Sequence, residues 1–196
     1  MFTFVPRTRH FAGDEILVDV DNIVACGSVC LTLPTCGAFA WFKNKEPKCK
    51  IFKRIYGAMS TPSNGTFYAP LALSSGQRIA LLPAPANPTW SDHLQACQAQ
   101  NLEMLHSPSN SRDVNIIASL GKVALDVQKS KPLPLFQLVI STHDSKHVDL
   151  SAFGSGFPAY EFFVYPKCLM VDFFNPYWLD CDSDITGAPN VVCVQP

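Results

Sequence analysis

Residues 26–52 read CGSVCLTLPTCGAFAWFKNKEPKCKIF, and this stretch decides the fold of the N-terminal half. It holds four of the 8 cysteines, and the other four are spread through the C-terminal half as Cys97, Cys168, Cys181 and Cys193. The spacings lack the paired CxxC knuckles of a zinc site, so disulfides are the better interpretation. Each half can therefore pair its cysteines internally, in an oxidising compartment.

The first part of this stretch predicts a helix. Asp19 or Asp21 can cap a helix that runs from about Asn22 to Leu33, and Pro34 ends it. Such a helix places its two cysteines four residues apart, on one face.

A hairpin is predicted after the helix. Gly37 to Phe42 and Cys49 to Lys53 have the composition of two strands that flank a polar turn. A helix on a hairpin buries little apolar area in about 70 residues, and domains of that size usually need covalent staples. We expect one staple from helix to strand and one at the helix exit, which are Cys26 to Cys49 and Cys30 to Cys36.

The first four cysteines have the spacing C-x3-C-x5-C-x12-C, with two cysteines on the predicted helix and a C-x-[IL]-F strand in the hairpin. This pattern resembles the PAN/apple family over about residues 1–70. Members of this family often carry a further bridge between the ends of the domain, and this chain lacks both of those cysteines. The resemblance implies a non-catalytic module that binds proteins or glycans.

The second half is expected to be α+β, with its helices early and its strands late. Helices are predicted over Trp90 to Gln100 and from Ser109 or Asn110 to Leu120. Short apolar runs predict strands at Arg78 to Leu82, Leu135 to Ile140, Pro166 to Val171 and Val191 to Val194.

The second half contains Trp90-x6-Cys97, Leu102-x2-Leu105 and the late residues Cys168, Trp178, Cys181 and Cys193. This pattern resembles the C-type-lectin-like fold over about residues 76–196. The resemblance implies that the outer cysteines pair, Cys97 with Cys193, and the inner ones pair, Cys168 with Cys181. Sugar-binding members hold calcium partly with a late Trp-Asn-Asp, and here that motif reads Trp178-Leu179-Asp180. Calcium needs six to eight oxygen ligands, so calcium-dependent sugar binding is not expected.

The fold expected from the whole chain is α+β, as two small disulfide-stapled domains. A PAN/apple-like helix-on-hairpin domain covers residues 1–72, and a C-type-lectin-like domain covers residues 73–196. The boundary lies in a short Pro/Ser/Gly stretch, PLALSSG, at residues 70–76. Charge divides there as well: residues 1–72 hold 8 Lys/Arg against 5 Asp/Glu, and residues 73–196 hold 7 against 11.

No catalytic residue is nominated. Every cysteine is assigned to a bridge, and no nucleophile elbow is present. His143 and His147 have helical ligand spacing, but they lie in a turn-like cluster without a third ligand. A weak cation site remains an alternative at Asp180, Asp182 and Asp184, which otherwise are solvated acids around the Cys181 bridge. We therefore expect no enzyme, no metal and no cofactor.

Six cations crowd the hairpin against the single acid Glu46: Lys43, Lys45, Lys48, Lys50, Lys53 and Arg54. Residues two apart on a strand share a face, so these side chains can form a basic strip that attracts sulfated glycans or acidic proteins. The alternative is a hairpin whose lysines only prevent edge aggregation.

Residues 153–178 hold ten aromatic side chains. Neighbours such as Phe173 and Phe174 cannot both enter one core, so some aromatics should meet a partner. The residues predicted to bind it are Phe157, Tyr160, Phe163, Tyr165, Phe174 and Tyr177. The alternative is that the two halves pack on each other and bury them.

An extracellular location is expected. The sequon Asn64-Gly65-Thr66 predicts an N-glycan on Asn64. Residues 1–7 lack the apolar core of a signal peptide, so a secretion signal is expected upstream, and no run of about 18 apolar residues predicts a membrane span. The sequence thus predicts an extracellular recognition or assembly protein that binds a protein or its own copies. The alternative is a sulfated-glycan or calcium-independent sugar binder, and no nucleic-acid partner is expected.

Overall fold

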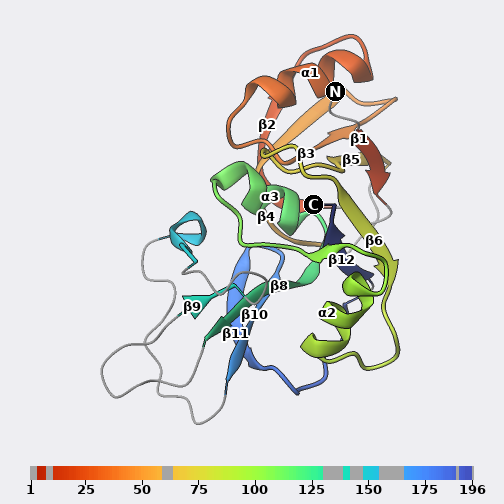
Figure 1. Cartoon of the computed structure of the whole chain (residues 1–196). Helices are drawn as coiled ribbons and strands as arrows, with labels where there is room; N and C mark the ends of the chain where they lie inside the picture. The colour runs from red at the N-terminus through yellow and green to blue at the C-terminus, as the bar shows by residue number, and fades with distance from the viewer. Residues whose placement is uncertain are drawn as a thin grey trace.

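The computed structural model describes residues 4–7, 11–58, 64–129, 139–141, 148–154, 166–188 and 190–195. Within these residues the chain forms three α-helices, one 3-10 turn and three antiparallel sheets (Figure 1). The predicted α+β class is confirmed. None of the described helices is long and apolar enough to cross a membrane.

The N-terminal half forms a five-stranded sheet. Its strand order is β1 (Phe4–Arg7), β5 (Thr66–Pro70), β3 (Ala38–Trp41), β4 (Cys49–Ala58) and β2 (Phe11–Val18). β3 and β4 pair with Trp41 opposite Cys49, so the predicted hairpin is confirmed. β2 and β5, which had not been predicted, extend this hairpin on either side.

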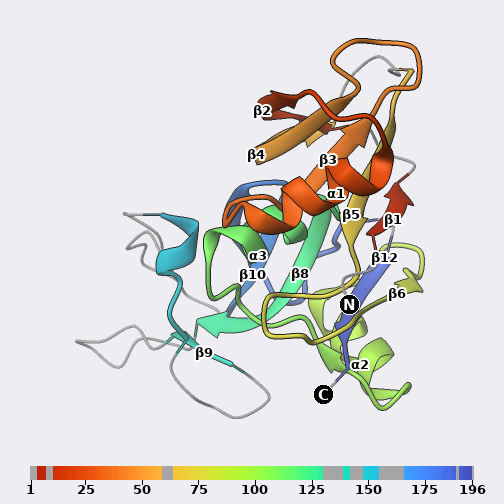
Figure 2. The ribbon, with the colours of Figure 1, turned by 90° about the horizontal axis from the view of Figure 1, so that it is seen from above.

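Helix α1 (Ile23–Thr32) lies across one face of this sheet (Figure 2). The predicted cap at Asp19 or Asp21 is wrong. Asn22 is the N-cap, because it directly precedes the first helical residue and its side chain accepts a hydrogen bond of 2.9 Å from the Ala25 amide.

The strands send alternate side chains to the two faces of the sheet. Phe39, Ile51 and Tyr68 face α1. The opposite face carries an aromatic cluster of Phe11, Phe52 and Phe67. Phe11 meets Phe67 edge-on with ring centroids 5.3 Å apart, and Phe52 stacks on Phe67 at 5.7 Å.

The C-terminal half contains α2 (Trp90–Gln98) and α3 (Ser111–Ala118), both within two residues of the predicted bounds. One sheet has the order β11 (Asn175–Asp180), β10 (Lys167–Asp172), β8 (Lys122–Lys129) and β9 (Val139–Ile140). A second has the order β6 (Ile79–Pro83), β12 (Asn190–Val194) and β7 (Glu103–Met104), and η1 spans Ser151–Phe153. β8 and β11 had not been predicted, and most of the predicted strand at residues 135–140 lies outside the described residues.

Four disulfides close within the halves. They join Cys26 to Cys49, Cys30 to Cys36, Cys97 to Cys193 and Cys168 to Cys181, the same pairs that the sequence predicts. The first two lie between α1 and the sheet, and the last two lie in the core that surrounds Trp90. The Trp90 indole donates a hydrogen bond of 2.8 Å to the Leu125 carbonyl, which ties α2 to β8.

Helix α3 joins the two halves (Figure 1). Its residues from Asp113 to Ala118 are all buried. The Asn115 amide donates hydrogen bonds to the carbonyls of Thr35, at 2.7 Å, and Lys53, and Arg112 donates one to the Leu31 carbonyl at 3.3 Å. Ala118 packs into the aromatic cluster of the first sheet. The second half thus covers the face of this sheet opposite α1.

Candidate functional site

A pocket of about 280 Å³ opens between α1 and the first sheet. Its floor is the ring pair Phe39 and Tyr68, stacked with centroids 5.1 Å apart and planes at 16°. The wall comes from α1 and consists of Ile23, Val24, Gly27, Ser28 and Leu31. We call these seven residues the α1 pocket.

Most side chains that line the α1 pocket are apolar. Helix α1 has the sequence IVACGSVCLT and carries no charged residue. A helix without a polar face normally lies buried, yet Val24 is 74% exposed. The Ser28 hydroxyl donates to the Val24 carbonyl at 2.9 Å, so its proton is already used within the helix. The lining contains no Asp, Glu, His, Lys or Arg, so the α1 pocket is equipped to bind by burial.

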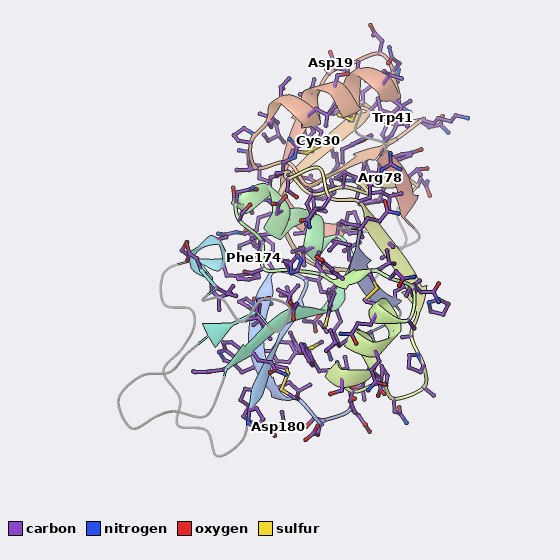
Figure 3. All side chains as sticks on the ribbon, in the orientation of Figure 1. Asp19, Cys30, Trp41, Arg78, Phe174 and Asp180 are labelled. Atoms are coloured by element: carbon purple, nitrogen blue, oxygen red, sulfur yellow. A yellow bond between two sulfur atoms is a disulfide. The ribbon has the colours of Figure 1, made fainter. Side chains whose placement is uncertain are left out.

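The surface around the N-terminus of α1 is acidic. Residues 11–42 contain four acids and no Lys or Arg. Asp14 accepts a hydrogen bond from the Tyr56 hydroxyl, and Glu15 pairs with Lys50 at 2.5 Å. Asp19 and Asp21 are exposed just before the helix and have no cationic partner among the described residues. Figure 3 shows Asp19 at the α1 end of the molecule, opposite the end that carries Asp180.

The predicted basic strip does not form as a continuous surface. Lys43 and Lys45 lie in the turn between β3 and β4, where the alternation of a strand does not apply. Lys48 pairs with Glu46 at 3.1 Å, and Lys50 pairs with Glu15 of the unpredicted strand β2. The Arg54 guanidinium stacks on Phe174, 4.4 Å from the ring centroid. Three cations, Lys43, Lys45 and Lys53, are exposed and have no acidic partner in the described part of the chain.

The predicted aromatic surface is only partly described. Phe157, Tyr160, Phe163 and Tyr165 lie outside the described residues. Phe174 is half-buried against the core of the second half and lies under Arg54 of the first. Its neighbour Phe173 packs against the first half. Both rings are half-buried against parts of the two halves, which is what the alternative predicts for this pair. Tyr177 is half-buried, with the Lys122 ammonium 5.9 Å from its ring centroid.

The predicted acidic cluster does not gather into a cation site. Asp180 pairs with Lys167, and Asp182 and Asp184 are exposed beyond it. No group of three His, Cys, Asp or Glu residues is placed to hold a metal ion in the part of the chain that the structure describes. His143 and His147 lie outside that part. Asn64 and Thr66 of the sequon are both exposed.

A titratable cluster that had not been predicted lies between β7, β8 and β9. His106 has the Glu103 carboxylate 2.9 Å from Nε2 and the buried Asp126 carboxylate 3.6 Å from Nδ1. The Ser141 hydroxyl donates to the same Asp126 carboxylate at 2.8 Å. Glu103 is three residues from His106 along the chain, whereas Asp126 reaches it because its backbone amide donates to the Leu105 carbonyl at 2.8 Å.

Two histidines should make the free energy of unfolding depend on pH in opposite directions. Asp126, and then Glu103, raise the pKa of His106 against the opposing effect of burial. The stabilisation by His106 is therefore complete below about pH 6.5 and is lost as the pH rises through its folded-state pKa. Burial lowers the pKa of His93, partly offset by Asp92. The folded state thus loses stability as the pH falls below about 6.5, where the unfolded His93 binds its proton.

Urea unfolding measured between about pH 5 and 8.5 checks both signs. His106→Gln should remove the alkaline decrease in unfolding free energy, and His93→Phe should remove the acid decrease. Each variant serves as the control for the other. Unchanged pH slopes in both variants would assign the pH dependence to other groups.

No protein-family model matches this chain, and none of the curated proteins matches it. The PAN/apple and C-type-lectin-like resemblances therefore rest on the spacings of the cysteines and tryptophans.

Proposed function

We propose that this chain is a non-catalytic extracellular recognition protein that binds a protein partner at the α1 pocket. In this proposal residues 1–72 form a PAN/apple-like recognition module. Residues 73–196 form a C-type-lectin-like module that supports it through α3. The four disulfides favour an oxidising, extracellular setting.

The observation that carries the proposal is an apolar pocket on an exposed, uncharged helix. Small apolar pockets that accept one large side chain are where protein interfaces concentrate their binding energy. The floor is held in place, because Phe39 and Tyr68 belong to adjacent paired strands. Helix α1 is fixed at both ends, by Asn22 at its start and by Arg112 at its end. A preorganised pocket of this kind loses little conformational entropy when it is filled.

The proposal moves the contact away from the aromatic surface that the sequence favoured. Phe174 already contacts Arg54, which leaves it less available to a partner. Glycan binding is the second candidate, and the exposed Lys43, Lys45 and Lys53 favour it.

An indole titration followed by ¹H–¹⁵N NMR tests the proposal. Indole should shift the amides of α1 and of Tyr68 in the wild type, with millimolar affinity. Ser28→Trp places a ring over the α1 pocket and should weaken this binding at least about tenfold. Leu17→Ser is the control, because Leu17 is an exposed apolar residue on β2 that does not line the pocket.

The outcomes separate the two candidates. If indole leaves α1 unshifted while heparin shifts the hairpin in a salt-dependent way, the second candidate replaces the first. Light scattering on the same samples shows whether the partner is another copy of the chain. If it is, the wild type should form oligomers, and Ser28→Trp should lower the measured molecular mass.

A further inference from the structure

We infer that the partner segment at the α1 pocket is cationic, with an apolar side chain in the pocket and a neighbouring Lys or Arg beside Asp19 and Asp21. This inference rests on the proposed function and names the chemistry of its partner. Two independent observations support it, the apolar lining and the sign of the charge beside it.

The charged residues of the segment that contains α1 have one sign, and Arg112 contacts the helix at its other end, through the Leu31 carbonyl. All the charged residues between positions 11 and 42 are acids, although residues 1–72 as a whole hold 8 Lys/Arg against 5 Asp/Glu. Six of these eight cations lie on the hairpin turn and on β4, Arg7 lies on β1, and Arg9 lies outside the described residues. Glu15, the acid of this group that pairs with a cation, does so on β2 with Lys50. Asp19 and Asp21 therefore contribute an unneutralised negative potential at the α1 end.

This potential selects among apolar segments. An acidic segment that placed its side chain in the α1 pocket would bring like charges close to Asp19 and Asp21, and that repulsion lowers its affinity. A Lys or Arg next to the apolar residue gains attraction and keeps its own charge hydrated, because both carboxylates are exposed. Exposed pairs are weak and screened by salt, so the preference should be modest and salt-dependent.

Four short peptides test the inference on the whole chain. A tryptophan or a serine is placed at the centre, flanked by lysine, serine or glutamate, as GKKWKKG, GSSWSSG, GEEWEEG and GKKSKKG with blocked ends. Affinity is measured by titration and the site is located from the amide shifts of α1. GKKWKKG should bind about three- to tenfold more tightly than GSSWSSG at low salt, and GEEWEEG should bind most weakly. High salt should remove these differences.

Charge variants locate the effect. The double variant Asp19→Asn/Asp21→Asn should bring GKKWKKG and GSSWSSG to equal affinity. Asp182→Asn/Asp184→Asn removes the same number of exposed acids on the far side of the molecule and should leave the preference intact. Circular dichroism confirms that each variant folds, since Asn22 still caps α1.

Failure of the inference and failure of the proposed function give different results. Equal binding of all three tryptophan peptides at α1 overturns the inference and leaves the α1 pocket as the binding site. Equal binding of GKKSKKG and GKKWKKG also overturns it, because the pocket would then contribute nothing. If no tryptophan peptide shifts α1, the proposed function itself is wrong.

Discussion

Gly37→Ala is expected to lower the free energy of unfolding by about 3 kcal/mol. A Cβ atom at position 37 would lie 2.5 Å from the Asn115 carbonyl carbon, the Asn115 Cβ and the Ile116 amide nitrogen. Two of these three atoms are backbone, so no rotamer change relieves the contact. Helix α3 cannot withdraw cheaply either, because its residues from Asp113 to Ala118 are buried.

The same contact controls hydrogen bonds. A shift of α3 away from residue 37 lengthens the bonds from Asn115 to the carbonyls of Thr35 and Lys53. Buried carbonyls that lose their donors cost about 1–3 kcal/mol each. Gly37 is therefore a position where a single added methyl group disturbs the packing of the two halves.

Gly57→Ala is the matched control for this experiment. An added Cβ at Gly57 meets nothing within 4 Å, so its unfolding free energy should stay within about 0.5 kcal/mol of the wild type. Urea unfolding of both variants, followed by tryptophan fluorescence, measures the difference. Equal stabilities of Gly37→Ala and Gly57→Ala would contradict the close approach of α3 to the first sheet.

The second large effect is expected from the bridge between Cys97 and Cys193. The double variant Cys97→Ala/Cys193→Ala should lose up to about 4.7 kcal/mol in the chain-entropy model. The two cysteines are 96 residues apart, so this bond restricts most of the C-terminal half in the unfolded chain. It also joins α2 to the central strand β12, and both residues are fully buried.

Cys30→Ala/Cys36→Ala provides the comparison. These cysteines are equally buried but only 6 residues apart, so the same model gives a loss of about 2 kcal/mol. Differential scanning calorimetry of both double variants tests the ranking. If the short bridge costs as much as the long one, packing rather than chain entropy controls the contribution of these bonds.

Local sequence signals were enough for the helices and for the two disulfides of the N-terminal half. Trp90 to Gln100 and the segment from Ser109 or Asn110 to Leu120 begin at polar caps and continue with apolar residues, and α2 and α3 form there. The four cysteines at positions 26 to 49 lie close together in sequence, so the sequence predicts that they pair with one another. The remaining two pairs followed from the lectin-like spacing.

Two of the missed strands show where local signals fail. β2 reads FAGDEILV, and its pairing with β4 shifts register between Ala12 and Gly13 and again between Asp14 and Glu15. These irregularities break the period of two that predicts a strand. β8 reads KVALDVQK and is almost entirely buried, so its pattern does not alternate.

The candidate sites depended on contacts between distant residues. Tyr68 completes the α1 pocket only because β5 pairs with β3 and stacks it on Phe39. Lys50 ceases to be a free cation only because β2 brings Glu15 beside it. Asp126 meets His106 only because β8 is hydrogen-bonded to the segment that follows β7, from the Asp126 amide to the Leu105 carbonyl.

The sequence by itself determined the elements whose causes are local: capped helices, the β3–β4 hairpin, and bridges that hold small cores together. Tertiary structure alone decided which faces remain exposed. Asn115 is a polar residue of a helix that could have faced water, and it is buried because the first half supplies its carbonyl partners. Asp113 is buried because Ser74, Ser109 and Asn110 donate hydrogen bonds to its carboxylate. Helix α1 is apolar enough for a core, and part of it is exposed because no described element covers its outer side. Burial is a property of the whole assembly, so its pattern cannot be read from one segment.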